Sequence, residues 1–332
     1  MMGMFVVMCL VLSTTASAMD YQYTTKDAPF PGVTDTALTG SNDFGDIVGL
    51  YQDQGKMDQG VLLKQRYVGT LLNVIPQGIN NAGAIVGLYL DKKVGFVLQH
   101  GTFTVVKVPA CNLSDPAPCD SRRRGPILVT DVWDSNEAGV VVGSYRDGTG
   151  VIRSFTYDPR QAEAQRYQVF DPPWPQSAHV AMGINNWGTI VGFFLDPGGL
   201  SHGYIKHGAQ FTPFDVPGAV ETELVSINDA EQILLLADGH TFIWDGDDFD
   251  EIQVPMAQLT QGYALTNTGT VVGRFLDGTN TDHGFVARLV LTNTRKKPSG
   301  VVESLVKRGR VDVCLSGSKY RYAYCRQQGD VQ

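Results

Sequence analysis

The chain has 332 residues, of which 43% are hydrophobic and 18% are charged, a composition that is ordinary for a globular protein and excludes extensive disorder. The formal net charge is −8, but nine Lys or Arg stand against three Asp or Glu from Arg295 onward, so the body is acidic and the tail is basic. An acidic body disfavours nucleic-acid binding, because contacts to phosphates require clustered cationic side chains.

Residues 1–18 read as a secretory signal peptide. An apolar run from Met4 to Leu12 is followed by the small-residue triplet Ala16, Ser17 and Ala18, which is typical of a cleavage site. The run is shorter than the roughly 20 residues that a membrane-spanning helix needs. We therefore expect a secreted chain, extracellular or periplasmic, with no membrane span after processing.

A strand is expected next, over Tyr21 to Pro29. The text QYTTKDAPFPGVTDTALTGSN from Gln22 matches QFTPFDVPGAVETELVSIN from Gln210, which reads as the fourth strand of a repeat followed by the next repeat. The last repeat has only three strands, ending in HGFVARLV from His283. We predict that the N-terminal strand supplies the missing fourth strand and covers an open sheet edge.

Six copies of one motif follow, beginning with SNDFGDIVGLYQD at Ser41 and INNAGAIVGLYLD at Ile79. Each unit holds four β-branched and aromatic runs separated by Gly, Asn, Asp and Pro, without helical periodicity. The units are 38 to 56 residues apart, about the size of a propeller blade. Their anchoring residues are Asn42, Asn80, Asn136, Asn185, Asn228 and Asn267. The predicted fold class is all-β, a six-bladed β-propeller of four-stranded antiparallel blades over residues 19–292, closed by the N-terminal strand.

The motif itself is predicted to be a turn and not an active site. The Asn side chain can bond its own backbone, and the glycine three residues later, such as Gly188, can adopt a positive φ. A second glycine, such as Gly192, indicates the close approach of another backbone or ring. The fifth copy has Glu231 and Leu235 at these positions, so we expect its blade to be the least regular.

Two insertions interrupt the repeat, around Cys111 to Pro126 and around Asp158 to His179, and both are interpreted as blade-to-blade connections. The first contains an arginine run that suits anions, and the second contains two aromatic residues that suit stacking, although solvated surface loops are the alternative. These residues are Arg122, Arg123, Arg124, Tyr167 and Trp174.

Recurring polar residues are interpreted as structural. An Asp ends the second strand of every unit and is expected to begin a turn rather than to bind a cation. His202 and His283 recur before a glycine, which favours a structural hydrogen bond, and Ser201 in GLSHG lies in a hairpin and not in a nucleophile elbow. We predict no catalytic residue, no metal and no cofactor. The six aspartates are Asp53, Asp91, Asp147, Asp196, Asp238 and Asp277.

The binding site is expected on one face of the ring. We place the NxxG turns and the His-Gly turns on one face, and the blade-to-blade connections and the six aspartates on the other, which we expect to bind. Its candidate binding residues are Asp131, Trp174, His179 and Glu221.

Residues 293–332 form a basic tail outside the repeat. Four cysteines remain after the signal peptide, in two close pairs, and local disulfides are the simplest of three pairings in an exported chain. The tail pair could staple a small hairpin. The predicted disulfides are Cys111–Cys119 and Cys314–Cys325.

Copies of INxxGxIVGxYxD, HGF and FTxFDVPGA resemble the HAF family of probable extracellular repeats, over roughly Tyr21 to Leu291. The resemblance implies an extracellular repeat protein and no particular chemistry. The first hypothesis is a secreted, monomeric, non-catalytic binding module for an extracellular glycan or protein. An enzyme acting on polysaccharide through Asp131, Glu221 and Glu223 is the alternative, and a structural envelope or matrix protein is the third reading.

Overall fold

The computed structural model describes residues 20–54, 58–110, 126–290, 313–316 and 323–326. Tyr21–Val290 form one compact unit. In the other unit, β25 (Val313–Ser316) and β26 (Ala323–Arg326) pair as an antiparallel hairpin in which Cys314 lies opposite Cys325. The signal peptide, Cys111 and Cys119 lie outside the described residues, and both disulfides stay predictions.

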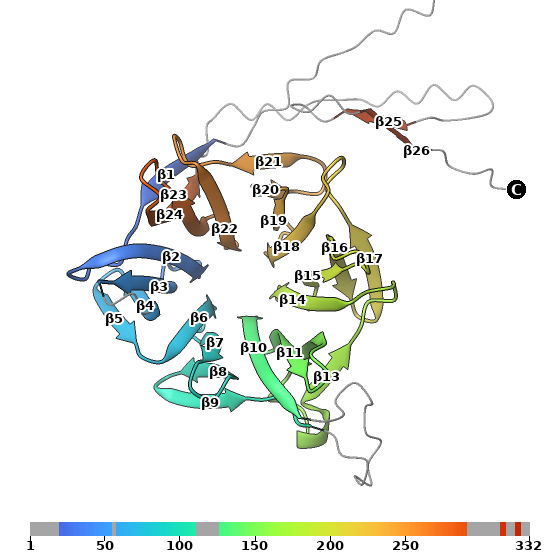
Figure 1. The fold of residues 1–332 in the computed structure, drawn as a ribbon, viewed down its shortest axis with the longest axis horizontal. Coiled ribbons are helices and arrows are strands. Elements are labelled where there is room, and N and C mark those ends of the chain that lie inside the picture. The colour runs from blue at the N-terminus through green and yellow to red at the C-terminus, as the bar shows by residue number, and fades with distance from the viewer. Residues whose placement is uncertain (1–19, 55–57, 111–125, 291–312, 317–322, 327–332) are drawn as a thin grey trace, which may run out of the picture. The chain divides into compact units, whose positions relative to one another are not determined.

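Six antiparallel sheets of four strands stand around a central channel, so the predicted six-bladed propeller is confirmed (Figure 1). Blades one to five each take four consecutive strands, paired in chain order. Blades one to three are built from β2 (Val33–Ser41), β3 (Ile47–Asp53), β4 (Asp58–Lys64) and β5 (Tyr67–Leu71); β6 (Val74–Ile79), β7 (Ile85–Tyr89), β8 (Val94–Gln99) and β9 (Thr102–Val106); and β10 (Ile127–Ser135), β11 (Val141–Asp147), β12 (Ile152–Tyr157) and β13 (Tyr167–Phe170).

The remaining three blades repeat this arrangement, and the helical content of the described residues is one short 3-10 turn, η2 (Glu163–Gln165). Blades four to six are built from β14 (Ala178–Ile184), β15 (Ile190–Leu195), β16 (Ser201–His207) and β17 (Gln210–Phe214); β18 (Thr222–Ile227), β19 (Ile233–Ala237), β20 (His240–Trp244) and β21 (Phe249–Ile252); and β22 (Leu259–Leu265), β23 (Val271–Leu276) and β24 (Asp282–Leu289).

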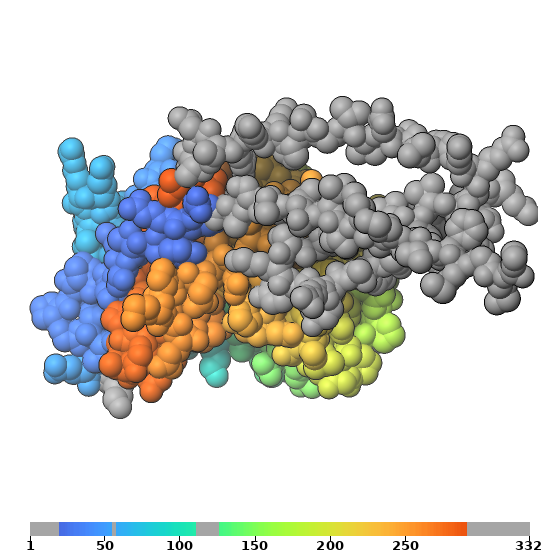
Figure 2. Space-filling model, turned by 90° about the horizontal axis from the view of Figure 1, so that it is seen from above, coloured from blue at the N-terminus to red at the C-terminus, as the bar shows by residue number. Residues whose placement is uncertain are grey.

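The N-terminal strand closes the ring. β1 (Tyr21–Thr25) pairs antiparallel with β24, with Tyr21 opposite Leu289, and becomes the fourth strand of blade six. The blue N-terminal segment accordingly lies against the orange last blade (Figures 1 and 2). The predicted closure is confirmed, and it leaves β24 without a free edge.

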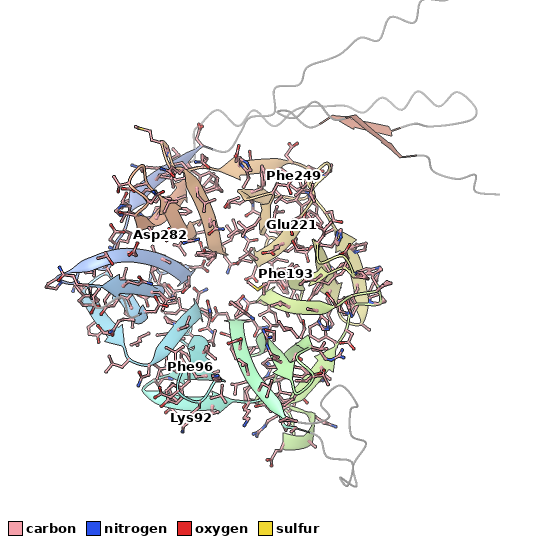
Figure 3. The ribbon with its side chains drawn as sticks, in the orientation of Figure 1. Lys92, Phe96, Phe193, Glu221, Phe249 and Asp282 are labelled. Atoms are coloured by element: carbon pink, nitrogen blue, oxygen red, sulfur yellow. The ribbon has the colours of Figure 1, made fainter. Side chains whose placement is uncertain are left out.

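Large side chains at one position of the third strand fill the space between neighbouring blades. Phe96, Phe155, Tyr204 and Phe285 are fully buried at this position, and Figure 3 shows Phe96 inside blade two. Burying one such side chain stabilises the fold by about 1.5–3 kcal/mol. The β-period of the sequence places these residues on the same face of every blade.

The second glycine of the motif lies under a carbonyl group of the inner strand. A Cβ on Gly192 would lie 2.0 Å from the carbonyl oxygen of Val180 and 2.9 Å from the hydroxyl of Tyr204. The predicted close approach is therefore confirmed, and any side chain here would force the two strands apart.

The fifth blade keeps the common pattern, so the prediction that it is the least regular is wrong. Its strands pair in the same order, and its inner strand has its bulge at the same place. Glu231 adopts a φ of 59°, near the 75–82° of the glycines at this turn position in the other blades. Left-handed geometry costs a residue with a Cβ roughly 1–2 kcal/mol, which the hydrogen bonds of the turn offset here.

The anchoring Asn residues join the blades to one another. The Oδ1 atom of Asn185 accepts from the backbone N–H groups of Trp187 and Thr189, which closes the turn, while its Nδ2 group donates to the carbonyl of Asn228 in the next blade at 3.2 Å. Asn42, Asn80, Asn136 and Asn228 make the equivalent links. In blade six Thr266 takes this place. The predicted anchor of this blade, Asn267, is therefore wrong by one residue.

The links between the anchoring Asn residues form a first belt of hydrogen bonds. A second belt surrounds the channel without a break. The backbone N–H of the residue after each anchor donates to the side-chain oxygen of its counterpart in the next blade, at 2.8–2.9 Å. Carboxylates and carboxamides alternate around this belt, which consists of Asp43, Asn81, Glu137, Asn186, Asp229 and Asn267. Sequence reasoning missed it, although all six copies have Asp, Asn or Glu here.

Candidate functional site: a cleft between two blades

The ring has two different faces. We call the face with the turns between first and second strands, and between third and fourth strands, the turn face, and the opposite one the loop face. His202 begins a third strand, and its ring lies 3.0 Å from Asp215 and 3.7 Å from Asp196 on the loop face. The prediction that the His-Gly turns share a face with the NxxG turns is therefore wrong, because those histidines follow the turn between strands two and three.

Three of the six aspartates at the ends of second strands close turns, as predicted, whereas the carboxylate of Asp238 accepts from the backbone N–H groups of Val220 and Glu221 before its blade. The Oδ1 atom of Asp277 accepts from the backbone N–H groups of Thr281 and Thr279, and these bonds hold the pKa of Asp277 at about 2. Asp147 and Asp196 cap their turns in the same way. Within the described residues, no group of three or more His, Cys, Asp or Glu is arranged to hold a metal ion.

The four candidate binding residues lie on four different segments of the loop-face half. Asp131 lies in β10, where burial raises the pKa of its carboxyl to about 6 against the opposing charge of Arg146. Glu221 is exposed just before β18 in blade five (Figure 3). Trp174 is half-buried, and its ring stacks on Phe194 of blade four with 5.1 Å between the ring centroids, so this ring face is occupied.

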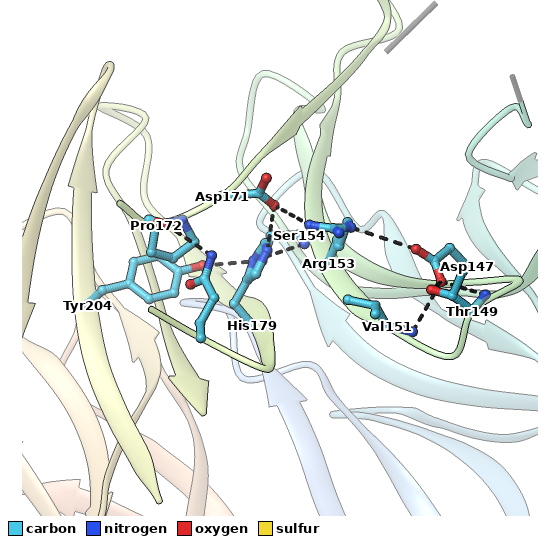
Figure 4. A network of polar contacts seen from close by, with 10 residues as sticks. Asp147, Thr149, Val151, Arg153, Ser154, Asp171, Pro172, His179 and Tyr204 are labelled. Atoms are coloured by element: carbon cyan, nitrogen blue, oxygen red, sulfur yellow. Dashed lines mark hydrogen bonds and ion pairs between the residues drawn. The ribbon is translucent and has the colours of Figure 1, made fainter. Parts of the chain in front are cut away.

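His179, the fourth candidate, joins blades three and four (Figure 4). Its Nδ1 atom lies 3.2 Å from the backbone N–H of Ser154 and 2.8 Å from the Ser154 hydroxyl, and its Nε2 atom lies 2.8 Å from Asp171. Because a backbone N–H only donates, Nδ1 accepts and Nε2–H donates to Asp171. Ser, His and Asp are the residues of a catalytic triad, but Ser154 and His179 are 0% and 1% exposed, so this group serves structure.

The second insertion is divided by a strand. Tyr167 begins β13, so residues 158–166 form a turn on the turn face and only residues 171–177 connect two blades. The Tyr167 ring packs on Tyr157 at 4.8 Å, and its hydroxyl accepts from the backbone N–H of Lys107. It is therefore not a free stacking platform. Arg122, Arg123 and Arg124 lie outside the described residues.

A cleft of about 450 Å³ opens on the turn face between blades two and three. The β8–β9 hairpin forms one wall, and the β10–β11 turn with the end of β12 forms the other. Val97, Val141 and Pro159 supply apolar surface, and Tyr157 lies between them. A volume of this size suits a small organic ligand, for which pockets of about 300–1,000 Å³ are usual.

Five polar side chains in this cleft have no hydrogen-bond partner among the residues that the structure describes: Gln99, His100, Thr102, Thr104 and Tyr157. Glu137 differs, because its two carboxylate oxygens accept from the backbone N–H groups of Asn81 and Ala82. The cleft thus offers an amide, an imidazole and three hydroxyl groups that are free to bind a ligand. Sequence reasoning missed this site because hairpin residues of one blade gave no motif.

The central channel offers less room. In every inner strand one extra residue forms a β-bulge, and these six residues line a cavity of about 100 Å³ near the turn face. This volume suits about three water molecules, at roughly 30 Å³ each. The bulge residues are Thr39, Gln77, Trp133, Met182, Val225 and Tyr263.

No family model and no curated protein matches the chain, so the resemblance to HAF repeats stays a prediction. Among solved structures, it is similar to virginiamycin B lyase from Staphylococcus aureus, with 10% identity, a TM-score of 0.44 and coverage of 82% of this chain and 100% of the lyase. It is also similar to the Aleuria aurantia lectin in complex with Fucα1-6GlcNAc, with 8% identity, a TM-score of 0.45 and coverage of 79% of this chain and 93% of the lectin. The SapL1 lectin in complex with α-methyl fucoside matches with 10% identity, a TM-score of 0.45 and coverage of 78% of this chain and 97% of the lectin. No helix of the described residues is long and apolar enough to cross a membrane.

Proposed function

We propose that the protein is an extracellular, non-catalytic binding module that takes a glycan group into the cleft between blades two and three. One observation carries this proposal. Gln99, Thr102, Thr104 and Tyr157 present unpaired polar groups around a cavity of about 450 Å³. Paired strands carry these groups, so their backbone is positioned before a ligand arrives, which lowers the entropic cost of binding.

A glycan fits the cleft better than a protein does. A stable protein–protein interface buries more than about 1,000 Å² and is usually wide, whereas this site is a single recess. Sugars combine hydroxyl groups with apolar C–H faces, and the cleft combines hydroxyl and amide groups with Val97, Val141 and Pro159. The extracellular location rests on the signal-like segment of residues 1–18.

A glycan array followed by calorimetry on the secreted protein tests this function. Thr104→Ala should weaken binding roughly two- to tenfold, because one hydrogen bond contributes about 0.5–1.5 kcal/mol. Thr212→Ala is the matched control, since Thr212 holds the same strand position in blade four and should leave affinity unchanged. Absence of binding to any glycan, or equal losses in both variants, would remove support for the cleft.

An enzyme acting on polysaccharide is the second candidate, because Asp131 and Glu223 are two of three inner-strand acids with raised pKa values. Burial raises the pKa of Asp131 to about 6, and burial together with nearby Glu221 raises the pKa of Glu223. A carboxyl group whose pKa is raised toward neutral pH is better suited to act as a general acid. Release of reducing ends from a bound polysaccharide, abolished by Glu223→Gln, would favour this reading over simple binding.

A further inference from the structure

In blades one and four, a pair of polar side chains lies at the place that is open between blades two and three. In blade one, Asp46 before the second strand forms an ion pair of 2.7 Å with Lys64 at the end of the third strand. In blade four the same two positions hold Thr189 and His207, which are hydrogen-bonded at 3.1 Å. These pairs close the end of the blade that faces its neighbour.

Among the described residues, blade two has no such pair, and neither do blades three, five and six. In blade two the counterparts are Ala84, which has only a methyl group, and Gln99, which is left without a partner among the described residues. The neighbouring blade contributes Ala138, where blades one and four have Phe44 and Trp187. This is the one interface in the sequence with alanine at both positions, and it is the interface where the cleft lies.

The charges around the cleft limit the ligand further. Among the residues that the structure describes, its lining contains no Lys or Arg, and it includes the carboxylate of Glu137. A uronic acid or sulfated sugar would lose hydration and gain no cationic partner. The free Gln99 amide can instead donate to one sugar hydroxyl and accept from another.

We infer that the propeller has a single specificity site, in which an uncharged saccharide replaces the missing closing partner of Gln99, and that Ala84 keeps this site open. The inference rests on the proposed function and goes beyond it in naming the sugar class, the stoichiometry and the two determining residues. The six-fold repeat therefore does not make the protein multivalent.

The test transfers the closing pair of blade one into blade two. Ala84→Asp combined with Gln99→Lys should fill the cleft and weaken binding at least tenfold, with the thermal midpoint little changed. The matched control, Thr189→Asp combined with His207→Lys, makes the same exchange in blade four and should leave affinity unchanged. The probes are methyl glycosides of neutral hexoses and the corresponding uronic acids, measured by calorimetry.

The outcomes separate the two proposals. A stoichiometry of one, preference for neutral glycosides and loss in the blade-two variant alone would support the inference. If the wild-type protein binds no saccharide, the proposed function itself fails. If it binds saccharide but the blade-two variant binds equally well, or if several sites or the uronic acids are preferred, the binding function stands and the inference is overturned.

Discussion

At the scale of single residues, a few side chains determine whether neighbouring blades stay joined. Asn185 is 3% exposed and makes three hydrogen bonds, two within its turn and one to the next blade. Thr266 shows that a hydroxyl can replace one of the two bonds within the turn, because its Oγ1 atom accepts from the N–H of Thr270. The two functions of this position can therefore be separated by mutation.

Asn185→Ala should lower the free energy of unfolding by about 2–3 kcal/mol, because it leaves buried backbone groups without partners. Asn185→Thr should cost about 1–2 kcal/mol, since it keeps the bond from the backbone N–H of Thr189 and loses the donation to the carbonyl of Asn228 and the bond from Trp187. Denaturant unfolding of both variants provides the measurement. Equal losses would mean that the hydrogen bond kept within the turn contributes nothing.

Glu231→Gly should stabilise the protein by roughly 0.5–1 kcal/mol. The substitution removes the strain of a φ of 59°, partly offset by the greater freedom of glycine in the unfolded chain. Glu231→Ala is the control, because it removes the same carboxylate and keeps the strain. A denaturant midpoint that does not rise for glycine relative to alanine would show that the turn is unstrained.

At the scale of elements, β1 is the strand on which closure of the ring depends. It pairs with β24 over five residues, and the hydroxyl of Tyr23 also accepts from the backbone N–H of Gln253 in the connection after β21. The strand thus touches two blades.

Deletion of residues 1–25 should expose the edge of β24 and cause aggregation or loss of cooperative unfolding. A truncation of residues 1–20, which leaves β1 intact, is the control and should unfold as the full chain does. Light scattering and denaturant unfolding distinguish the two. A soluble and equally cooperative 1–25 deletion would show that the belts alone hold the ring.

The strands and their order were predicted well because the sequence pattern of each strand recurs in the six repeats. Period-two runs, turn residues and the counterpart of the fourth strand at Gln22 fixed blade number and closure. The cleft could not be predicted in this way, since it depends on what is missing at Ala84 and Ala138 and on a comparison of equivalent positions in space. His179 shows the opposite limit, because a residue without counterparts in other blades proved to be a buried link between two of them.

At the scale of the whole molecule, the wall of the channel makes stability depend on pH. Burial raises the pKa of Asp134 to about 7, although the backbone N–H groups of Ile184 and Ser135 donate to its carboxylate. The folded protein therefore holds this proton more strongly than the unfolded chain, whose Asp titrates near 3.8. Stability from this group is present at low pH and is lost as pH rises from about 4 to 7.

Asp134→Ser should remove this dependence and raise stability at pH 8 by on the order of 1 kcal/mol. Serine already occupies the equivalent position in blade five, where Ser226 accepts from the backbone N–H of Leu265 in the same way. Thermal melts of both proteins between pH 4 and 8 provide the measurement. Parallel curves would show that Asp134 is ionised throughout this range.

The pairing of Tyr21 with Leu289 also means that the covalent start and end of the propeller are direct neighbours on adjacent strands. A few added residues could join them, and a new start could then be opened in a connection between two other blades, such as the one between β17 and β18. Synthesis of the chain could therefore begin at a different blade without changing the order of the blades around the ring. A chain permuted in this way should build the same ring, with all six blades formed from four consecutive strands.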